Sequence, residues 1–138
     1  NNKTQSLGMA HGMPSIISFL SKVYARDKKK KKTAEMVSKA IKWILKKELK
    51  GQNSLFANTG NDNSASRLSW CYGDLSISLA LFHAGKNFGN IFWMEEAKRI
   101  AINSAERNFE SANIHIHETG YFDPCFCHGT GVHFDRDP

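Results

Sequence analysis

The hydrophobic positions along the first third of the chain predict two helices. One is expected to start near Pro14, because proline favours the first turn of a helix, and apolar residues recur every three or four positions as far as Tyr24. The other is predicted to run from a Thr33 cap to Gly51. Its apolar side alternates with a lysine-rich side, which is typical of an amphipathic surface helix.

The pattern predicts a second pair of helices after a loop rich in Asn, Ser and Gly at residues 53–69. The helix at 74–84 is apolar nearly all round, as buried helices are, and we expect Gly85 to end it. The helix at 91–109 is amphipathic, and residues 110–124 are predicted to be loop or short extended chain. In that fourth helix the predicted inward residues are Met94, Ala97, Ala101 and Ala105, and the predicted outward residues are Glu95, Lys98, Arg99 and Arg107.

Three similar motifs punctuate this pattern, at residues 11–16 (HGMPSI), 72–77 (YGDLSI) and 127–132 (CHGTGV). In each motif a glycine follows a His or Tyr residue, and the predicted inner helices begin there. Such self-similarity marks a repeat architecture. We therefore expect an all-α fold of helical hairpins repeated around a ring or along a superhelix. The whole of 1–138 is predicted to be one incomplete domain of about three hairpins, the last truncated, because the chain begins with Asn and stops inside the third repeat.

Charge changes this picture at one place. The net charge is +6, and Lys28–Lys32 is an unbroken run of five lysines that is predicted to form a solvated loop. Contact with an acidic peptide or an anionic membrane is the alternative. No aromatic residues interleave the lysines, which argues against nucleic acid as a partner.

Targeting signals and cysteine usage bear on the compartment. No apolar run approaches the roughly 20 residues of a membrane span, and no signal peptide pattern opens the chain. Three cysteines is an odd number, and Cys125 and Cys127 are too close together to join separate elements. We expect reduced thiols in the cytoplasm, with association to a membrane surface as a further option.

The motifs also carry the candidate chemistry. If the starts of the inner helices converge, Cys71, Cys127, His128 and His11 meet, and a helix N-terminus favours thiolate over thiol. Two thiolates and an imidazole would give Zn2+ three ligands and leave a fourth position open. The alternatives are a buried, inert Cys71 with an incidental thiol at 127, and Cys125 as an additional ligand. The remaining histidines are predicted to be structural or solvated: His83 (a hydrogen-bonded core residue), His115, His117 and His133.

Taken as a set, three blocks resemble the signatures of the lanthionine synthetase C family: Ala10-His11-Gly12, Arg67–Gly73 (RLSWCYG) and Cys127-His128-Gly129. The resemblance implies an α/α toroid with zinc at the mouth of its inner helices. It also implies an enzyme that adds the Cys thiol of a dehydrated precursor peptide to dehydroalanine or dehydrobutyrine, closing a thioether ring. A dehydratase is then a further expected partner.

The resemblance assigns roles to six residues of this chain. It implies zinc ligation by Cys71, Cys127 and His128, with the substrate thiol in the open position. It makes His11 the acid or base that handles the substrate proton, and it places Arg67 and Tyr72 beside the zinc, where they would steady the enolate oxygen.

Departures from the family pattern keep other functions open. Ser76 stands where glycine is common, the last motif continues with Thr130-Gly131 in place of a pair of small residues, and the family's catalytic Asp lies upstream of the first block. We therefore expect this piece alone to be inactive and to pair its exposed apolar flanks with another copy or with the rest of the chain. The alternatives are a relative that adds glutathione to dehydroamino acids, and a zinc-dependent peptide-binding scaffold without chemistry.

Overall fold

The computed structural model describes residues 5–27, 30–113 and 127. Within them it contains four helices: α1 (Met13–Arg26), α2 (Lys31–Leu45), α3 (Gly73–Phe88) and α4 (Ile91–Ala105). These ranges hold no strand, only an isolated antiparallel bridge between Ser6 and Thr59. The all-α prediction is thus confirmed for the described residues, and none of their helices is long and apolar enough to cross a bilayer.

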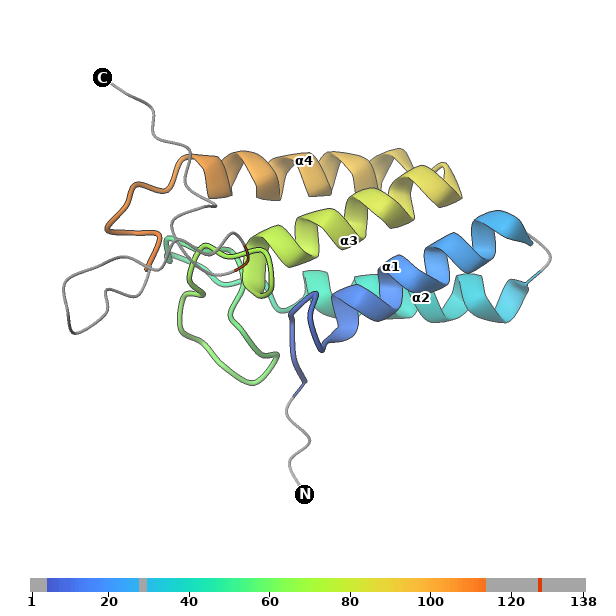
Figure 1. Cartoon of the computed structure of the whole chain (residues 1–138), viewed down its shortest axis with the longest axis horizontal. Helices are drawn as coiled ribbons and strands as arrows, with labels where there is room; N and C mark the ends of the chain where they lie inside the picture. The colour runs from blue at the N-terminus through green and yellow to red at the C-terminus, as the bar shows by residue number, and fades with distance from the viewer. Residues whose placement is uncertain (1–4, 28–29, 114–126, 128–138) are drawn as a thin grey trace.

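The four helices form two neighbouring hairpins. α1 packs against α2, α3 packs against α4, and the hairpins meet where α1 lies along α3 (Figure 1). The N-termini of α1 and α3 lie toward the same end of the molecule, so the loops that precede them are neighbours. This is the arrangement that an arc of an α/α toroid requires.

A single hydrophobic core joins the hairpins. It draws on all four helices and on the loops before α1 and before α3, and it excludes water almost completely. Its most deeply buried large side chains are Leu7, Ile17, Ile41, Ile44, Phe56, Ile77, Leu81 and Ile100. Aromatic contacts close the far end of the hairpins, where Tyr24 stacks on Phe88 with ring centroids 4.0 Å apart. The motif loops are therefore mounted on a rigid support.

The second helix differs from its predicted bounds at both ends. It begins at Lys31, not after a Thr33 cap, so Lys31 and Lys32 belong to its first turn, with their side chains in solvent. Lysine is a good helix former, so an exposed lysine run can extend a helix as readily as a loop. The helix ends at Leu45, well before Gly51, because the amide of Leu49 donates to the carbonyl of Leu55 at 2.8 Å and turns the chain back. Lys28 and Lys29 lie outside the described residues.

The C-terminal ends of α3 and α4 also differ from their predicted positions. Gly85 does not end α3; it lies inside the helix, where a side chain would collide with Met94 of α4, and the helix continues to Phe88 with Gly89 at φ 66° as its cap. α4 ends at Ala105 rather than at residue 109. Ala105, predicted to face inward, is exposed. The predictions placed glycine as a helix stop, whereas here it permits close helix packing.

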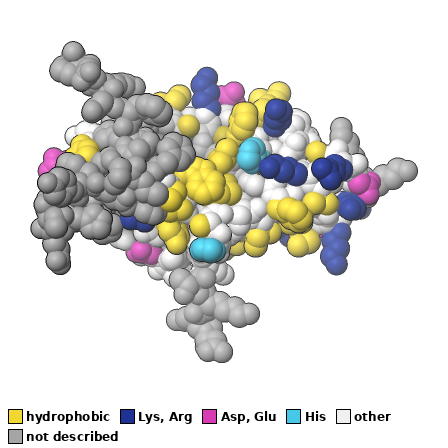
Figure 2. All heavy atoms as spheres, viewed as in Figure 1, with side chains coloured by type: hydrophobic (Ala, Val, Ile, Leu, Met, Phe, Trp, Pro, Cys, Tyr) yellow, Lys and Arg dark blue, Asp and Glu magenta, His cyan; other side chains and the backbone are white. Residues whose placement is uncertain are grey.

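An apolar hollow of about 660 Å³ lies along the flank of α3 and α4 that faces away from α1. Trp70, Leu75, Leu79 and Phe82 supply much of its lining, and Met94 and Ala101 face them from α4. Hydrophobic side chains gather visibly on the surface of the molecule (Figure 2), and Phe82 and Trp70 are 49% and 37% exposed. Such a flank favours the expectation that it pairs with another copy or with the rest of the chain, which stays a prediction.

Candidate metal centre

The N-terminus of α3 is built around Gly73. Its φ of +66° is a conformation that L side chains rarely adopt, and a Cβ at this position would collide with Ser66 Oγ. Tyr72 is the N-cap residue, in extended conformation, and Cys71 immediately precedes it. The glycine therefore places Cys71 directly before the start of the helix.

Cys71 and Cys127 are brought together from distant parts of the sequence. The amide of Cys71 donates to the carbonyl of Cys127 at 3.2 Å, and Cys71 Sγ lies 3.0 Å from the same oxygen. Cys71 is a free thiol with only 7% of its surface exposed, while Cys127 is partly buried. The structure thus places two of the predicted ligand residues side by side.

The loop that carries His11 packs directly on these residues. A Cβ on Gly8 would overlap the carbonyl oxygen of Cys71 and come within 2.8 Å of the Tyr72 ring, so the loop approaches as closely as only glycine permits. The loop is also tied down by the Leu7 amide, which donates to the carbonyl of Asn58 at 2.9 Å. His11 itself lies in the turn before α1 and is exposed.

The remaining predicted site residues are placed less completely. Arg67 is partly buried in the loop that leads to Cys71, next to Leu68, whose amide bonds to the carbonyl of Ala112 at 2.7 Å. His128, the third predicted zinc ligand, lies outside the described residues, as does Cys125. Among the described residues no group of three or more His, Cys, Asp or Glu side chains is placed to hold a metal. Cysteine sulfur is a common zinc ligand, so the side chains of Cys71 and Cys127 are of a kind that could hold this metal.

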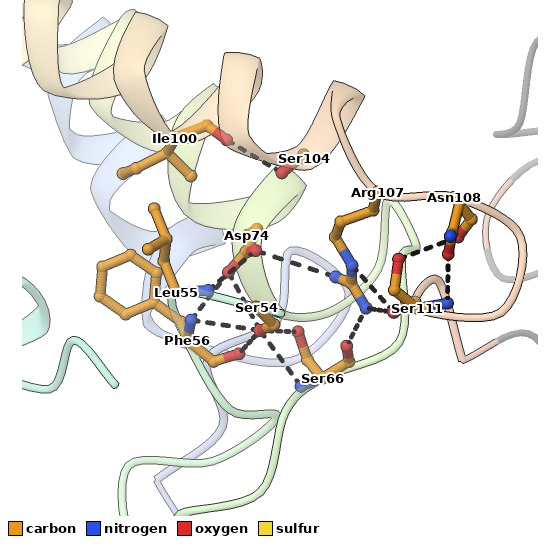
Figure 3. A network of polar contacts seen from close by, with 10 residues as sticks. All are labelled: Ser54, Leu55, Phe56, Ser66, Asp74, Ile100, Ser104, Arg107, Asn108 and Ser111. Atoms are coloured by element: carbon orange, nitrogen blue, oxygen red, sulfur yellow. Dashed lines mark hydrogen bonds and ion pairs between the residues drawn. The ribbon is translucent and has the colours of Figure 1, made fainter. Parts of the chain in front are cut away.

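A buried polar network supports the same helix start from behind (Figure 3). Asp74, 1% exposed, accepts hydrogen bonds from the amides of Leu55 (3.1 Å) and Phe56 (2.8 Å). Its carboxylate also forms an ion pair with Arg107 at 3.8 Å. Arg107 in turn donates to the carbonyl of Ser66 at 2.7 Å, and Ser66 is the residue that stands behind Gly73.

Burial has the largest effect on the pKa values of Asp74 and Arg107. Desolvation raises the pKa of Asp74, although the amide hydrogen bonds and the charge of Arg107 act in the opposite direction. Desolvation likewise lowers the pKa of Arg107, against the opposing effect of Asp74. Each ionised form thus depends on the other for its stability, so the loss of either partner leaves an unpaired buried charge.

Sequence reasoning missed this network and predicted an outward-facing Arg107. Arg107 is 5% exposed because α4 ends before it, and the chain turns its side chain inward toward Asp74. One signal was present in the sequence: Asp74 is a carboxylate in the first turn of an almost wholly apolar helix, and such a group requires a buried partner. His83 conforms better to its prediction, since it is partly buried and its Nδ1 lies 3.3 Å from Ser18 Oγ.

Comparison with known proteins adds the family. The model of the family described as "Lanthionine synthetase C-like protein" matches residues 1–131, which is nearly the whole chain and includes all three blocks. No curated protein and no solved structure matches the chain. With its paired helices, its motif glycines at the starts of the inner helices and this match, the chain belongs to the lanthionine synthetase C-like family.

Proposed function

We propose that this chain is part of a zinc-dependent enzyme that forms thioether bonds by adding a Cys thiol of a dehydrated peptide to dehydroalanine or dehydrobutyrine. The observation that supports the proposal is the contact of Cys71 with the carbonyl of Cys127, which brings these two candidate ligand residues together at the start of α3. Family membership supports a cyclase-type activity in general terms.

In this proposal Cys71, Cys127 and His128 hold the zinc. When bound, the metal lowers the pKa of the substrate thiol so that the thiolate is available at neutral pH. The low exposure of Cys71 limits the access of water to this side of the site, which strengthens every electrostatic interaction there.

The addition itself forms one bond and moves one proton. The substrate sulfur bonds to the β-carbon of the dehydroamino acid, and the electrons of its double bond move to the carbonyl to give an enolate. The α-carbon then takes up the proton that the thiol lost. We assign this proton transfer to His11, whose exposed ring sits on the loop that packs against Cys71, and stabilisation of the enolate oxygen to Arg67 and Tyr72.

A pair of variants in the full-length protein separates metal binding from proton transfer. We expect Cys71→Ala to lose both zinc and cyclisation, because one of three ligands is gone. We expect His11→Asn to keep its zinc and to cyclise about 10²-fold more slowly, which is the usual size of a general acid–base contribution. Metal content is measured by mass spectrometry of the desalted protein. Cyclisation is measured by the loss of alkylatable thiol in a dehydrated Cys-containing peptide.

The outcomes discriminate among the candidate functions. If His11→Asn loses zinc as Cys71→Ala does, His11 is a ligand and the assignment of roles is wrong. If the wild-type protein adds free glutathione to a dehydrated peptide that has no cysteine but leaves the peptide's own thiols untouched, the enzyme is a glutathione-adding relative. Zinc binding without either reaction would identify a peptide-binding scaffold.

A further inference from the structure

Ser76 joins two of the motif loops through its hydroxyl. The amide of Met9 donates to Ser76 Oγ at 3.0 Å, and the same hydroxyl donates to the carbonyl of Trp70 at 2.7 Å. Met9 lies two residues before His11, and Trp70 immediately precedes Cys71. One side chain in the first turn of α3 therefore connects the loop that carries the candidate proton-transfer residue to the loop that carries the candidate ligand.

The chemistry of this bridge is fully satisfied. A serine hydroxyl can donate one hydrogen bond and accept others. Here it accepts from the Met9 amide and donates to the Trp70 carbonyl. Ser76 is 0% exposed, so water cannot replace it. Without the hydroxyl, the Met9 amide would lose its acceptor and the Trp70 carbonyl would lose its donor, both in part-buried hydrogen bonds.

The bridge adds something that the packing of the two loops does not supply. The close approach of Gly8 to the Cys71 carbonyl fixes how near the loops come, but a contact between small groups leaves them able to slide past one another. Two directional hydrogen bonds that share one buried hydroxyl, one to each loop, fix their register as well. Misplacement of a catalytic group by even a fraction of an ångström slows a reaction that depends on near-attack geometry.

We propose that Ser76 is a positioning residue, which holds the His11 loop in register with Cys71. This inference rests on the proposed function for its consequence in catalysis, but not for its structural content. A glycine at this position, which the family pattern favours, would form no such bridge.

The experiment compares Ser76→Ala with a matched control on the same helix, Ser78→Ala, in the full-length protein. Ser78 is also buried, at 8% exposure, and its hydroxyl also donates to a main-chain carbonyl at 2.7 Å, but the acceptor is Ala97 of α4, away from the motif loops. Both variants lose one buried serine hydroxyl. Only one of them cuts the connection between the loops.

Two readouts do not depend on activity. In Ser76→Ala, we expect hydrogen exchange of the Met9 amide to quicken by about tenfold or more relative to Ser78→Ala, because local opening no longer breaks a hydrogen bond. We expect Cys71 to be alkylated correspondingly faster, as followed by peptide mapping. Ser76→Thr keeps the hydroxyl and should restore slow exchange at Met9.

A third readout links the bridge to the reaction. We expect Ser76→Ala to lower kcat for cyclisation by about tenfold while KM for the peptide stays unchanged, because chemistry and not binding is affected. Equal effects of Ser76→Ala and Ser78→Ala on the Met9 amide and on Cys71 would overturn the proposal. If the protein neither binds zinc nor cyclises, the function fails, yet exchange and alkylation still decide whether Ser76 couples the loops. If Ser76→Ala cyclises as the control does despite faster exchange, the positioning role is refuted.

Discussion

Replacing Arg107 by methionine tests the buried network beneath the start of α3. Methionine keeps much of the length and apolar volume of arginine but removes its charge and its donors. The substitution breaks the ion pair with Asp74 and the hydrogen bonds to the carbonyls of Ser66 and Ser111. It leaves the carboxylate of Asp74 buried without a cation.

The expected magnitude follows from burial. The side chains of Arg107 and Asp74 are 3% and 1% exposed, so solvent neither screens the pair nor compensates its loss. Removing one partner of such a pair destabilises a protein by about 3–5 kcal/mol. That is a large fraction of the roughly 5–15 kcal/mol by which a domain is stable.

Arg99 provides a matched control because it is also paired with carboxylates, at 2.8 Å from Glu48 and 2.9 Å from Glu96. Its side chain is 41% exposed, and exposed ion pairs contribute only about 0–1 kcal/mol. Arg99→Met should therefore cost about 1 kcal/mol or less. The ion pairs of Arg99 are shorter than the 3.8 Å pair of Arg107 with Asp74, so distance alone would predict the opposite order of the two effects.

Urea unfolding followed by far-UV circular dichroism measures both variants. A second substitution, Asp74→Asn, should cost less in the Arg107→Met background than in the wild type by about 1–3 kcal/mol, because the charge it removes is already unpaired. If Arg107→Met costs no more than Arg99→Met, or if the two substitutions at 74 and 107 are additive, burial does not govern this pair and the reasoning fails.

Two further predictions concern pH and surface charge. Burial, reinforced by Lys22 and Lys86, lowers the pKa of His83 below its ordinary 6.5. The neutral form of His83 therefore contributes stability that is fully present above pH 6.5 and is lost as the pH falls through the lowered pKa. His83→Asn should flatten this pH dependence in urea titrations at several pH values, and an unchanged slope would contradict the prediction. The second helix exposes lysines that include Lys32, Lys39 and Lys42. If this basic surface contacts anionic membranes, each Lys→Gln change should weaken binding to phosphatidylserine vesicles about fivefold, whereas the control Lys86→Gln should not. Equal binding to neutral vesicles would exclude attraction of these lysines to anionic lipid and leave an acidic peptide as the partner to test.

The repeat logic predicted the inner helices well. Gly12 precedes α1 and Gly73 begins α3. Gly73 has a φ of +66° that favours glycine, whereas Gly12 has extended backbone and lies so close to the Ser6 carbonyl that a side chain would collide with it. Proximity of Cys71 and Cys127 was likewise expected from their equivalent positions in the repeat. The ends of the outer helices were predicted less well, since the bond between Leu49 and Leu55 that turns the chain after α2 depends on tertiary packing.

Long-range polar contacts were beyond the reach of periodicity. Helical spacing sorts residues by their usual preference for water, and that preference places an arginine outside unless its partner is known. Arg107 is inside because Asp74, in the first turn of α3, is inside too. Ser76 appeared in the sequence only as a departure from the family pattern, because its two partners lie on loops whose proximity the fold creates.

Besides the bond from the Cys71 thiol, the contact between Cys71 and Cys127 contains a hydrogen bond from an amide to a carbonyl, groups that every residue other than proline possesses. Substituting either cysteine therefore removes sulfur without removing the hydrogen bond that brings the two segments together. The shape of this part of the chain and its sulfur chemistry can therefore change separately. A lineage with this arrangement can exchange either cysteine side chain while the main-chain bond keeps the two segments joined.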